Sequence, residues 1–440
     1  PGLGARLRDG DRTRGRLCNP LFVVAVPLLA TSLSTVVFQL SDLKFISAIG
    51  EEAVTAVVVT NQSFRQIVMI LLMGASFGAQ GMVSRLVGEG RLADADHVAG
   101  QLVTAGAVIS LVVAIAGFAF GREMLALMNV SPAVAELALP FLRITFALSF
   151  GWIFVTLFGA VLNGAGDSTT PMLVMLLQTT VSLVAEYLLI YGLVTGVPPF
   201  RIESVAVGQA AGQLLGVGIS LWVLFQGSSR VHVRVRHLVP DWPVMRAIFA
   251  QAWAPAVQML GSFVVNVYFL RLSGELGEKV QAAYSIGLRI AMAGPMFAFP
   301  LAGACATLVG QNLGAGSLSR AWRSLWVGLA AHAPLLTGAG LALIVFRHEF
   351  MAFFSDDPEL LALGAELLVY QGLAFMSWAF YFVFFRALQG AGDVFVPMVM
   401  ATGNALFVTR PVGWYLATQA GWGGSALFAP TRCCAVTGTG

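Results

Sequence analysis

The sequence predicts an all-α membrane protein built from two related bundles of six helices. Of its 440 residues, 58% are hydrophobic and 11% are charged, whereas soluble domains carry about 25% charged residues. The apolar residues gather in segments long enough to cross a bilayer, which requires about 20 residues per helix. The chain also contains an internal repeat that relates its first half to its second.

The repeat is clearest in a short polar turn. Leu162–Asp167 (LNGAGD) returns as Leu388–Asp393 (LQGAGD), a shift of 226 residues, and a Pro-Met pair follows each copy at Pro171 and Pro397. Further landmarks repeat at the same shift, including Trp152 with Trp378. Internal duplication of apolar segments is typical of secondary transporters, in which two bundles move about a central site.

Each predicted span is read as a helix, because no alternation of apolar and polar residues suggests a closed barrel. The predicted spans of the first half are 20–45, 53–84, 97–121, 137–162, 171–195 and 203–225, and those of the second are 246–271, 280–312, 322–346, 363–388 and 395–417. The repeat places a twelfth span near the end of the sequence, but residues 431–440 do not read as a membrane helix. We therefore expect a truncated or atypical last helix.

The distribution of charge predicts the orientation and the domain limits. Five arginines precede the first span, and the connections that follow the even-numbered spans are basic or mixed, so we expect a cytoplasmic N-terminus in the cell (inner or plasma) membrane. The predicted parts are an N-terminal segment (1–19), an N-lobe (20–225), a cytoplasmic linker (226–245), a C-lobe (246–430) and an atypical tail (431–440).

Several classes of function are excluded by composition and motifs. The net charge of +3 is small and dispersed, so no nucleic-acid partner is expected. The four cysteines lack metal-site spacing and imply no disulfide framework. An intramembrane enzyme would need a paired nucleophile and base or a metal cluster, and the spans show neither. We predict no enzymatic activity, no cofactor and no metal site.

The residues of interest are the ionisable groups inside predicted spans, where charge is costly. Asp42 and Lys44 lie in the first span and Glu186 lies in the fifth, one turn after Ser182 on the same face. The acids of the deep spans fall in the first half, which suggests a proton or cation site there, with Asp42 and Glu186 able to share one proton. The predicted intramembrane set is completed by Arg65, Arg143, Arg289 and the amides of Gln209 and Gln213.

A structural interpretation of the same residues stays open. Glu186 then pairs with an arginine, Arg65 or Arg289, to brace the bundle, while Asp42 and Lys44 lie at the membrane interface. Pro27 either allows span one to bend or forms a static kink near the helix start.

The chain resembles the multidrug and toxic compound extrusion (MATE) family. The resemblance rests on Pro27, Asp42 and Gly50 of span one, on both Gly-Ala-Gly-Asp turns with their Pro-Met pairs, and on Leu308–Gly316 after span eight. It implies twelve helices in two lobes that form a V, and export of small amphipathic, often cationic compounds in exchange for protons or sodium ions by alternating access.

The resemblance also implies roles for single residues. Asp42 matches the acid of the family's first span, Glu186 falls where many members have aspartate, and Ser182 where they have asparagine. Gln209 falls near a position usually held by threonine. Gly261 and Trp378 match the second-lobe acids of the sodium-coupled branch, so the chain looks closer to the branch named for a DNA-damage-inducible protein, with a proton site in the first lobe.

The mechanism that follows is proton (possibly sodium) antiport. Protonation of Asp42 and Glu186 rearranges span one near Pro27, and the cationic substrate loses its counter-charge. Lys44, Arg65 and Arg289 are candidate cavity or gating residues. We expect a monomer whose partners are small organic substrates and membrane lipid. The alternative is a flippase of lipids or lipid-linked saccharides from the same superfamily, for which the spans offer few basic residues.

Overall fold

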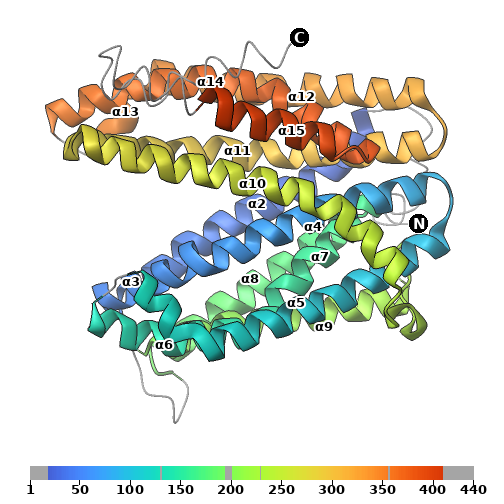
Figure 1. Ribbon diagram of the computed structural model, residues 1–440, viewed down its shortest axis with the longest axis horizontal. Helices are drawn as coiled ribbons and strands as arrows, with labels where there is room; N and C mark the ends of the chain where they lie inside the picture. The colour runs from blue at the N-terminus through green and yellow to red at the C-terminus, as the bar shows by residue number, and fades with distance from the viewer. Residues whose placement is uncertain (1–17, 129–130, 194–200, 228, 355–356, 410–440) are drawn as a thin grey trace. The chain divides into compact units, whose positions relative to one another are not determined.

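The computed structural model describes residues 18–128, 131–193, 201–227, 229–354 and 357–409 (Figure 1). Regular structure within these ranges is entirely helical, with no strand, which confirms the all-α fold class. Residues 1–17 of the predicted N-terminal segment (1–19) and the atypical tail 431–440 lie outside the described residues, as does any twelfth helix.

Contacts divide the chain into two compact units. One comprises Val26–Trp253, and the other comprises Ala254 onward together with the first turns of the first helix up to Ala25. Elements up to the linker are α2 (Cys18–Ser47), α3 (Glu51–Val59), the π-helical η1 (Thr60–Arg65), α4 (Gln66–Gly88), α5 (Leu92–Leu127), α6 (Pro132–Ala147), α7 (Ser149–Ala165), α8 (Thr169–Ile190), α9 (Ile202–Gln226) and η2 (Val235–Leu238). They are followed by α10 (Trp242–Leu276), α11 (Glu278–Gly314), α12 (Leu318–Val345), α13 (Arg347–Ala352), α14 (Pro358–Ala391), α15 (Phe395–Gly403) and η3 (Asn404–Thr409).

The unit boundaries fall inside two helices and beside two prolines. Helix α2 passes from one unit to the other at Val26, next to Pro27, and α10 does so at Ala254, next to Pro255. Pro27 and Pro255 are corresponding positions of the repeat, offset by 228 residues. Each half of the sequence therefore contains one helix that passes from one unit to the other beside a proline.

The helices follow the predicted spans, with interruptions that were not expected. The predicted span 137–162 is two helices, α6 and α7, bent by 47° at Leu148. The predicted span 53–84 is α3 and α4 joined through η1, a π-helical turn. Such turns are rare inside α-helices and often occur at functional sites.

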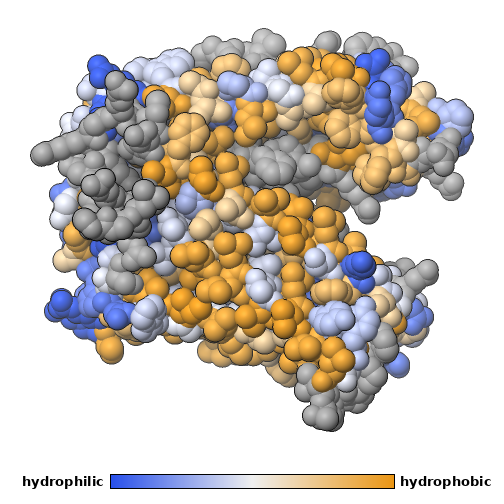
Figure 2. All heavy atoms as spheres, turned by 180° about the vertical axis from the view of Figure 1, so that it is seen from behind, coloured by the Kyte–Doolittle hydropathy of each residue, from blue (hydrophilic) through white to orange (hydrophobic). Residues whose placement is uncertain are grey.

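The lengths and composition of the helices are those of a multi-pass membrane protein. Among the described residues, eight helices are long and apolar enough to cross a membrane, or nine if α6 and α7 together form one span. Figure 2 shows apolar side chains over the middle of the helices and hydrophilic ones toward their ends. This pattern suits a surface that lipid covers between two aqueous phases.

The repeated Gly-Ala-Gly-Asp sequences fold into the same turn. Helices α7 and α14 end at Gly166 and Gly392, with φ of 88° and 90°, a left-handed conformation that glycine adopts without strain. The aspartates that follow cap the next helix: Asp167 accepts a hydrogen bond from the Thr170 N–H at 3.1 Å, and Asp393 accepts one from the Phe395 N–H at 3.1 Å. The repeated turn thus connects consecutive helices in both units.

The segment between α9 and α10 is anchored to the first unit by side chains of α5. Gln101 of α5 donates hydrogen bonds to the carbonyls of His237 (2.8 Å) and Val239 (2.7 Å) and accepts one from the Asp241 N–H (2.9 Å). His97 of the same helix bonds the Asp241 carboxylate at 2.9 Å. The linker is therefore an ordered part of this unit and not a free tether.

Candidate functional site

Three helices of the first unit bring the predicted acids together. Asp42 of α2 is half-buried, Glu186 of α8 is fully buried, and Gln209 of α9 is 4% exposed. The Gln209 side-chain amide donates to the Asp42 carboxylate, with 3.0 Å between Nε2 and Oδ1. The carboxyl groups of Asp42 and Glu186 also interact with each other. We refer to Asp42, Glu186 and Gln209 as the carboxyl site.

The carboxyl site is positioned by the parallel packing of α2 against α8. The Ser34 hydroxyl donates to that of Thr179 at 3.3 Å, and further along both helices the rings of Phe45 and Tyr187 lie 5.8 Å apart. These two contacts bracket Asp42 on α2 and Glu186 on α8. The register between the helices therefore sets the two carboxyl groups at the same level.

Close packing of α8 on α9 buries Glu186. Three glycines of α9, four residues apart, face three residues of α8: Gly208 lies against Glu186, and Gly212 and Gly216 lie against Ser182 and Gln178. A Cβ atom at Gly208 would stand 2.6 Å from Glu186 Cγ, closer than real contacts allow. Small residues at this spacing let membrane helices approach closely.

Ser182 contributes to this packing. Its hydroxyl donates to the backbone carbonyl of Gln209 at 3.2 Å. In the structure it therefore contacts the backbone of α9, in the helix turn before Glu186, and helps to hold the amide donor Gln209 in place.

Glu186 has an incomplete set of partners. Neither of its carboxylate oxygens makes a hydrogen bond of good geometry with any described residue, although Asp42 is near. Burying a charged carboxylate without partners is costly, and two adjacent carboxylates repel each other. A proton or another cation taken up between Asp42 and Glu186 relieves both penalties, and the two groups then titrate as a pair.

Arg65 is the cation that faces this site. It ends the π-helical η1, donates to the Asn61 side chain at 3.2 Å, and its guanidinium lies 5.3 Å from the ring centre of Trp152. It attracts the Asp42 carboxylate without forming a close ion pair within the described residues. Of the arginines considered from the sequence, Arg65 thus acts on Asp42, whereas the side chain of Arg289 lies outside the described part of α11.

The other predicted residues lie apart from the carboxyl site. Lys44 is exposed on α2. Pro27 lies 15 residues before Asp42 in the same helix, and its carbonyl accepts a hydrogen bond from the Thr31 hydroxyl at 3.0 Å. In the second unit Trp378 packs on Phe375, with 5.7 Å between ring centres, and a Cβ atom at Gly261 would meet only Thr402.

Sequence reasoning missed three features around the carboxyl site. The Gly208–Gly212–Gly216 spacing is visible in the sequence and signals close helix packing. The role of Trp152 as the partner of Arg65 and the π-helical turn before α4 have no comparable signal. Within the described residues no group of three or more potential metal ligands occurs.

Comparisons with known proteins agree with the fold. The MatE family model matches the chain twice, over residues 27–188 and 254–415. A probable multidrug resistance protein NorM of Thermotoga maritima is 24% identical over 400 residues, which cover 90% of this chain and 85% of that protein. Multidrug resistance protein NorM of Burkholderia vietnamiensis is 26% identical over 417 residues, covering 92% and 88%.

Solved structures share the fold. A MOP superfamily transporter from Pyrococcus furiosus superposes with a TM-score of 0.87 over 99% of this chain and 96% of that chain, at 17% sequence identity. The two matches to one family model also agree with the internal repeat. The chain belongs to the MatE family, whose members are membrane transporters and not enzymes.

Proposed function

We propose that this protein exports small amphipathic or cationic organic compounds in exchange for protons bound at the carboxyl site. The single observation that carries the proposal is the contact between Asp42 and Glu186, with Glu186 buried and poorly partnered. The names of the relatives, which are multidrug resistance proteins, support organic compounds as the cargo. They do not favour the alternative of a lipid or lipid-linked saccharide flippase.

The arrangement suggests how exchange works. With both carboxyl groups charged, the site attracts cations, and Arg65 supplies part of the compensating charge to Asp42. Protonation removes that attraction, and a cationic cargo then loses its counter-charge. A proton shifts the equilibrium between conformations only by binding them unequally. The carboxyl pair provides such a difference if one conformation separates Asp42 from Glu186.

The test is uptake of a fluorescent organic cation into proteoliposomes under a pH gradient or a sodium gradient, imposed one at a time. We expect transport to follow the pH gradient and to fall at least tenfold in Glu186→Gln and Asp42→Asn, since one unsatisfied charged interaction is worth about 1.5–3 kcal/mol. Glu203→Gln is the matched control, because this acid starts α9 and pairs with Arg201 at 3.2 Å, away from the site.

Two results would overturn the proposal. Equal pH-driven transport by the wild type and by both site variants would remove the carboxyl pair from coupling. Transport driven only by the sodium gradient would replace the proton by sodium as the coupling ion.

A further inference from the structure

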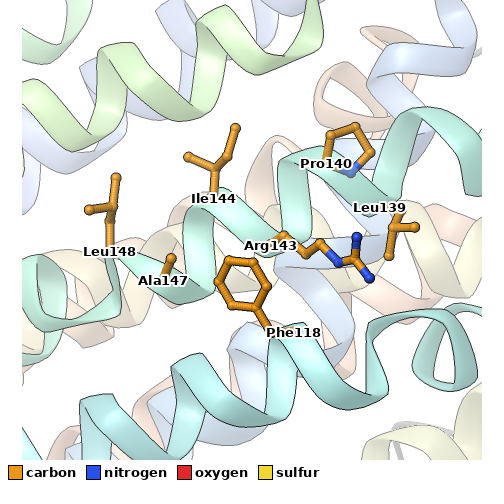
Figure 3. Close-up of a pocket in the computed structure, with 7 residues that line it drawn as sticks. All are labelled: Phe118, Leu139, Pro140, Arg143, Ile144, Ala147 and Leu148. Atoms are coloured by element: carbon orange, nitrogen blue, oxygen red, sulfur yellow. The ribbon is translucent and has the colours of Figure 1, made fainter.

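A groove on the first unit lies apart from the carboxyl site. It has a volume of about 510 Å³ and is lined by Phe118 of α5 and by residues between Leu139 and Leu148 at the end of α6 (Figure 3). Its walls are apolar except for one arginine, Arg143. The groove ends where α6 gives way to α7, at the 47° bend.

Arg143 lacks the partner that a charged group in a membrane span requires. Its Nε atom is buried without a hydrogen bond, and no acid of the described residues forms an ion pair with it. Its contact is with the face of Phe118, 6.0 Å from guanidinium carbon to ring centre. A cation–π contact recovers only part of the cost of placing an unpaired arginine in a bilayer.

The groove faces the surface that lipid covers. Phe118 is 55% exposed, and it continues an apolar face of α5 with Leu111 (61%) and Ile115 (56%), which lie on the same side of the helix. In Figure 3 the guanidinium extends toward Leu139, which lies one turn closer to the beginning of α6. Long basic side chains reach the headgroup level in this way.

We propose that this groove binds one anionic phospholipid, with an acyl chain on the apolar wall and the headgroup phosphate on Arg143. A planar guanidinium bonds a phosphate through two N–H groups, and a net negative headgroup leaves no competing positive charge near Arg143. The apolar wall distinguishes a lipid from free phosphate, which would use the arginine alone. None of the groove residues belongs to the carboxyl site, so the proposed lipid site is separate from the proposed proton site.

The experiment is native mass spectrometry of the delipidated full chain titrated with phosphatidylglycerol, with phosphatidylcholine of the same acyl chains, or with inorganic phosphate. We expect the first phosphatidylglycerol to bind at least tenfold more tightly than phosphatidylcholine, and free phosphate to bind weakly or not at all, because a charged hydrogen bond contributes about 1.5–3 kcal/mol. Arg143→Gln should abolish this preference and Arg143→Lys should keep part of it.

Two further variants make the result specific to the groove. Arg122→Gln removes an exposed arginine of α5 outside the groove and should leave the preference unchanged. Ala147→Phe fills the groove while keeping Arg143 and should weaken binding of both phospholipids, which gives a second test if Arg143→Gln fails to fold. Equal selectivity in the wild type and Arg143→Gln would refute the site, as would unchanged binding of both phospholipids by Ala147→Phe or binding of free phosphate as tight as that of phosphatidylglycerol.

Discussion

Gly208 is the residue at which a minimal change disturbs the carboxyl site most directly. A Cβ atom there would stand 2.6 Å from Glu186 Cγ, 2.7 Å from its backbone nitrogen and 2.8 Å from its Cα. Because two of these atoms are backbone, no side-chain rotation relieves the contact. Ordinary contacts begin at 3.4 Å, so α8 and α9 must separate by about 0.8 Å in Gly208→Ala.

This separation changes the site as well as the packing. Gln209 follows Gly208 in α9, and its bond to Asp42 is 3.0 Å long. A movement of about 0.8 Å away from α8 and α2 takes this distance beyond hydrogen-bonding range. Overpacking of this kind costs about 1–3 kcal/mol of folding free energy, and the lost bond to a charged group costs about as much again.

The assays are the thermal midpoint of the purified protein and pH-driven uptake in proteoliposomes. Gly218→Ala is the matched control, since it lies in the same helix and its Cβ atom would meet nothing within 4 Å. Replacing glycine by alanine in a helix is otherwise favourable by about 0.5–1 kcal/mol. We expect Gly208→Ala to lower both the midpoint and uptake, and Gly218→Ala to lower neither. The reasoning fails if the two variants behave alike.

Two predictions concern the linker that α5 anchors. Gln101→Ala removes three hydrogen bonds to the linker backbone and should destabilise the attachment of the linker by about 2 kcal/mol or more. The measurement is amide exchange over residues 231–241, which should become faster. Thr104→Val removes only the bond to Leu238 and is the milder control. Burial, and to a smaller extent nearby Arg236, lowers the pKa of His237 below its ordinary value of 6.5. Neutral His237 therefore contributes stability that is fully present above pH 6.5 and is lost as the pH falls through the lowered pKa. The protection factors of the linker amides, which compare observed with intrinsic exchange at each pH, should therefore fall in acid in the wild type and change less in His237→Gln; equal acid responses would contradict this.

The apolar composition and the internal repeat predicted the helical, two-part architecture, because both are properties of the whole chain and do not depend on single contacts. The span predicted at 203–225, for example, is the helix Ile202–Gln226. The bend at Leu148 was missed because no proline lies at it: Pro140 is eight residues earlier inside α6, and Gly151, three residues later, lies in an otherwise continuous apolar segment. The π-helical turn at Thr60–Arg65 depends on packing that no local pattern encodes.

The residues of the carboxyl site show the same division. Asp42 and Glu186 were selected from the sequence because acids are rare in membrane spans. Their contact, however, depends on the register of α2 against α8 and on the glycine face of α9, which bring together residues 144 positions apart. The sequence likewise did not predict the partner of Arg65. Trp152 is one of nine tryptophans, and its contact with Arg65 is formed only in the folded structure.

The prolines at the two unit boundaries bear on how such a chain arose. Helix α2 passes from one unit to the other beside Pro27, and α10 does so beside Pro255. Each compact unit therefore includes helical turns that belong to the other half of the sequence. A single-copy ancestor with this arrangement completes itself only by exchanging its first helical turns with a second molecule, as domain-swapped dimers do. In this chain the two copies are covalently joined, so the same exchange takes place within one polypeptide and does not depend on concentration.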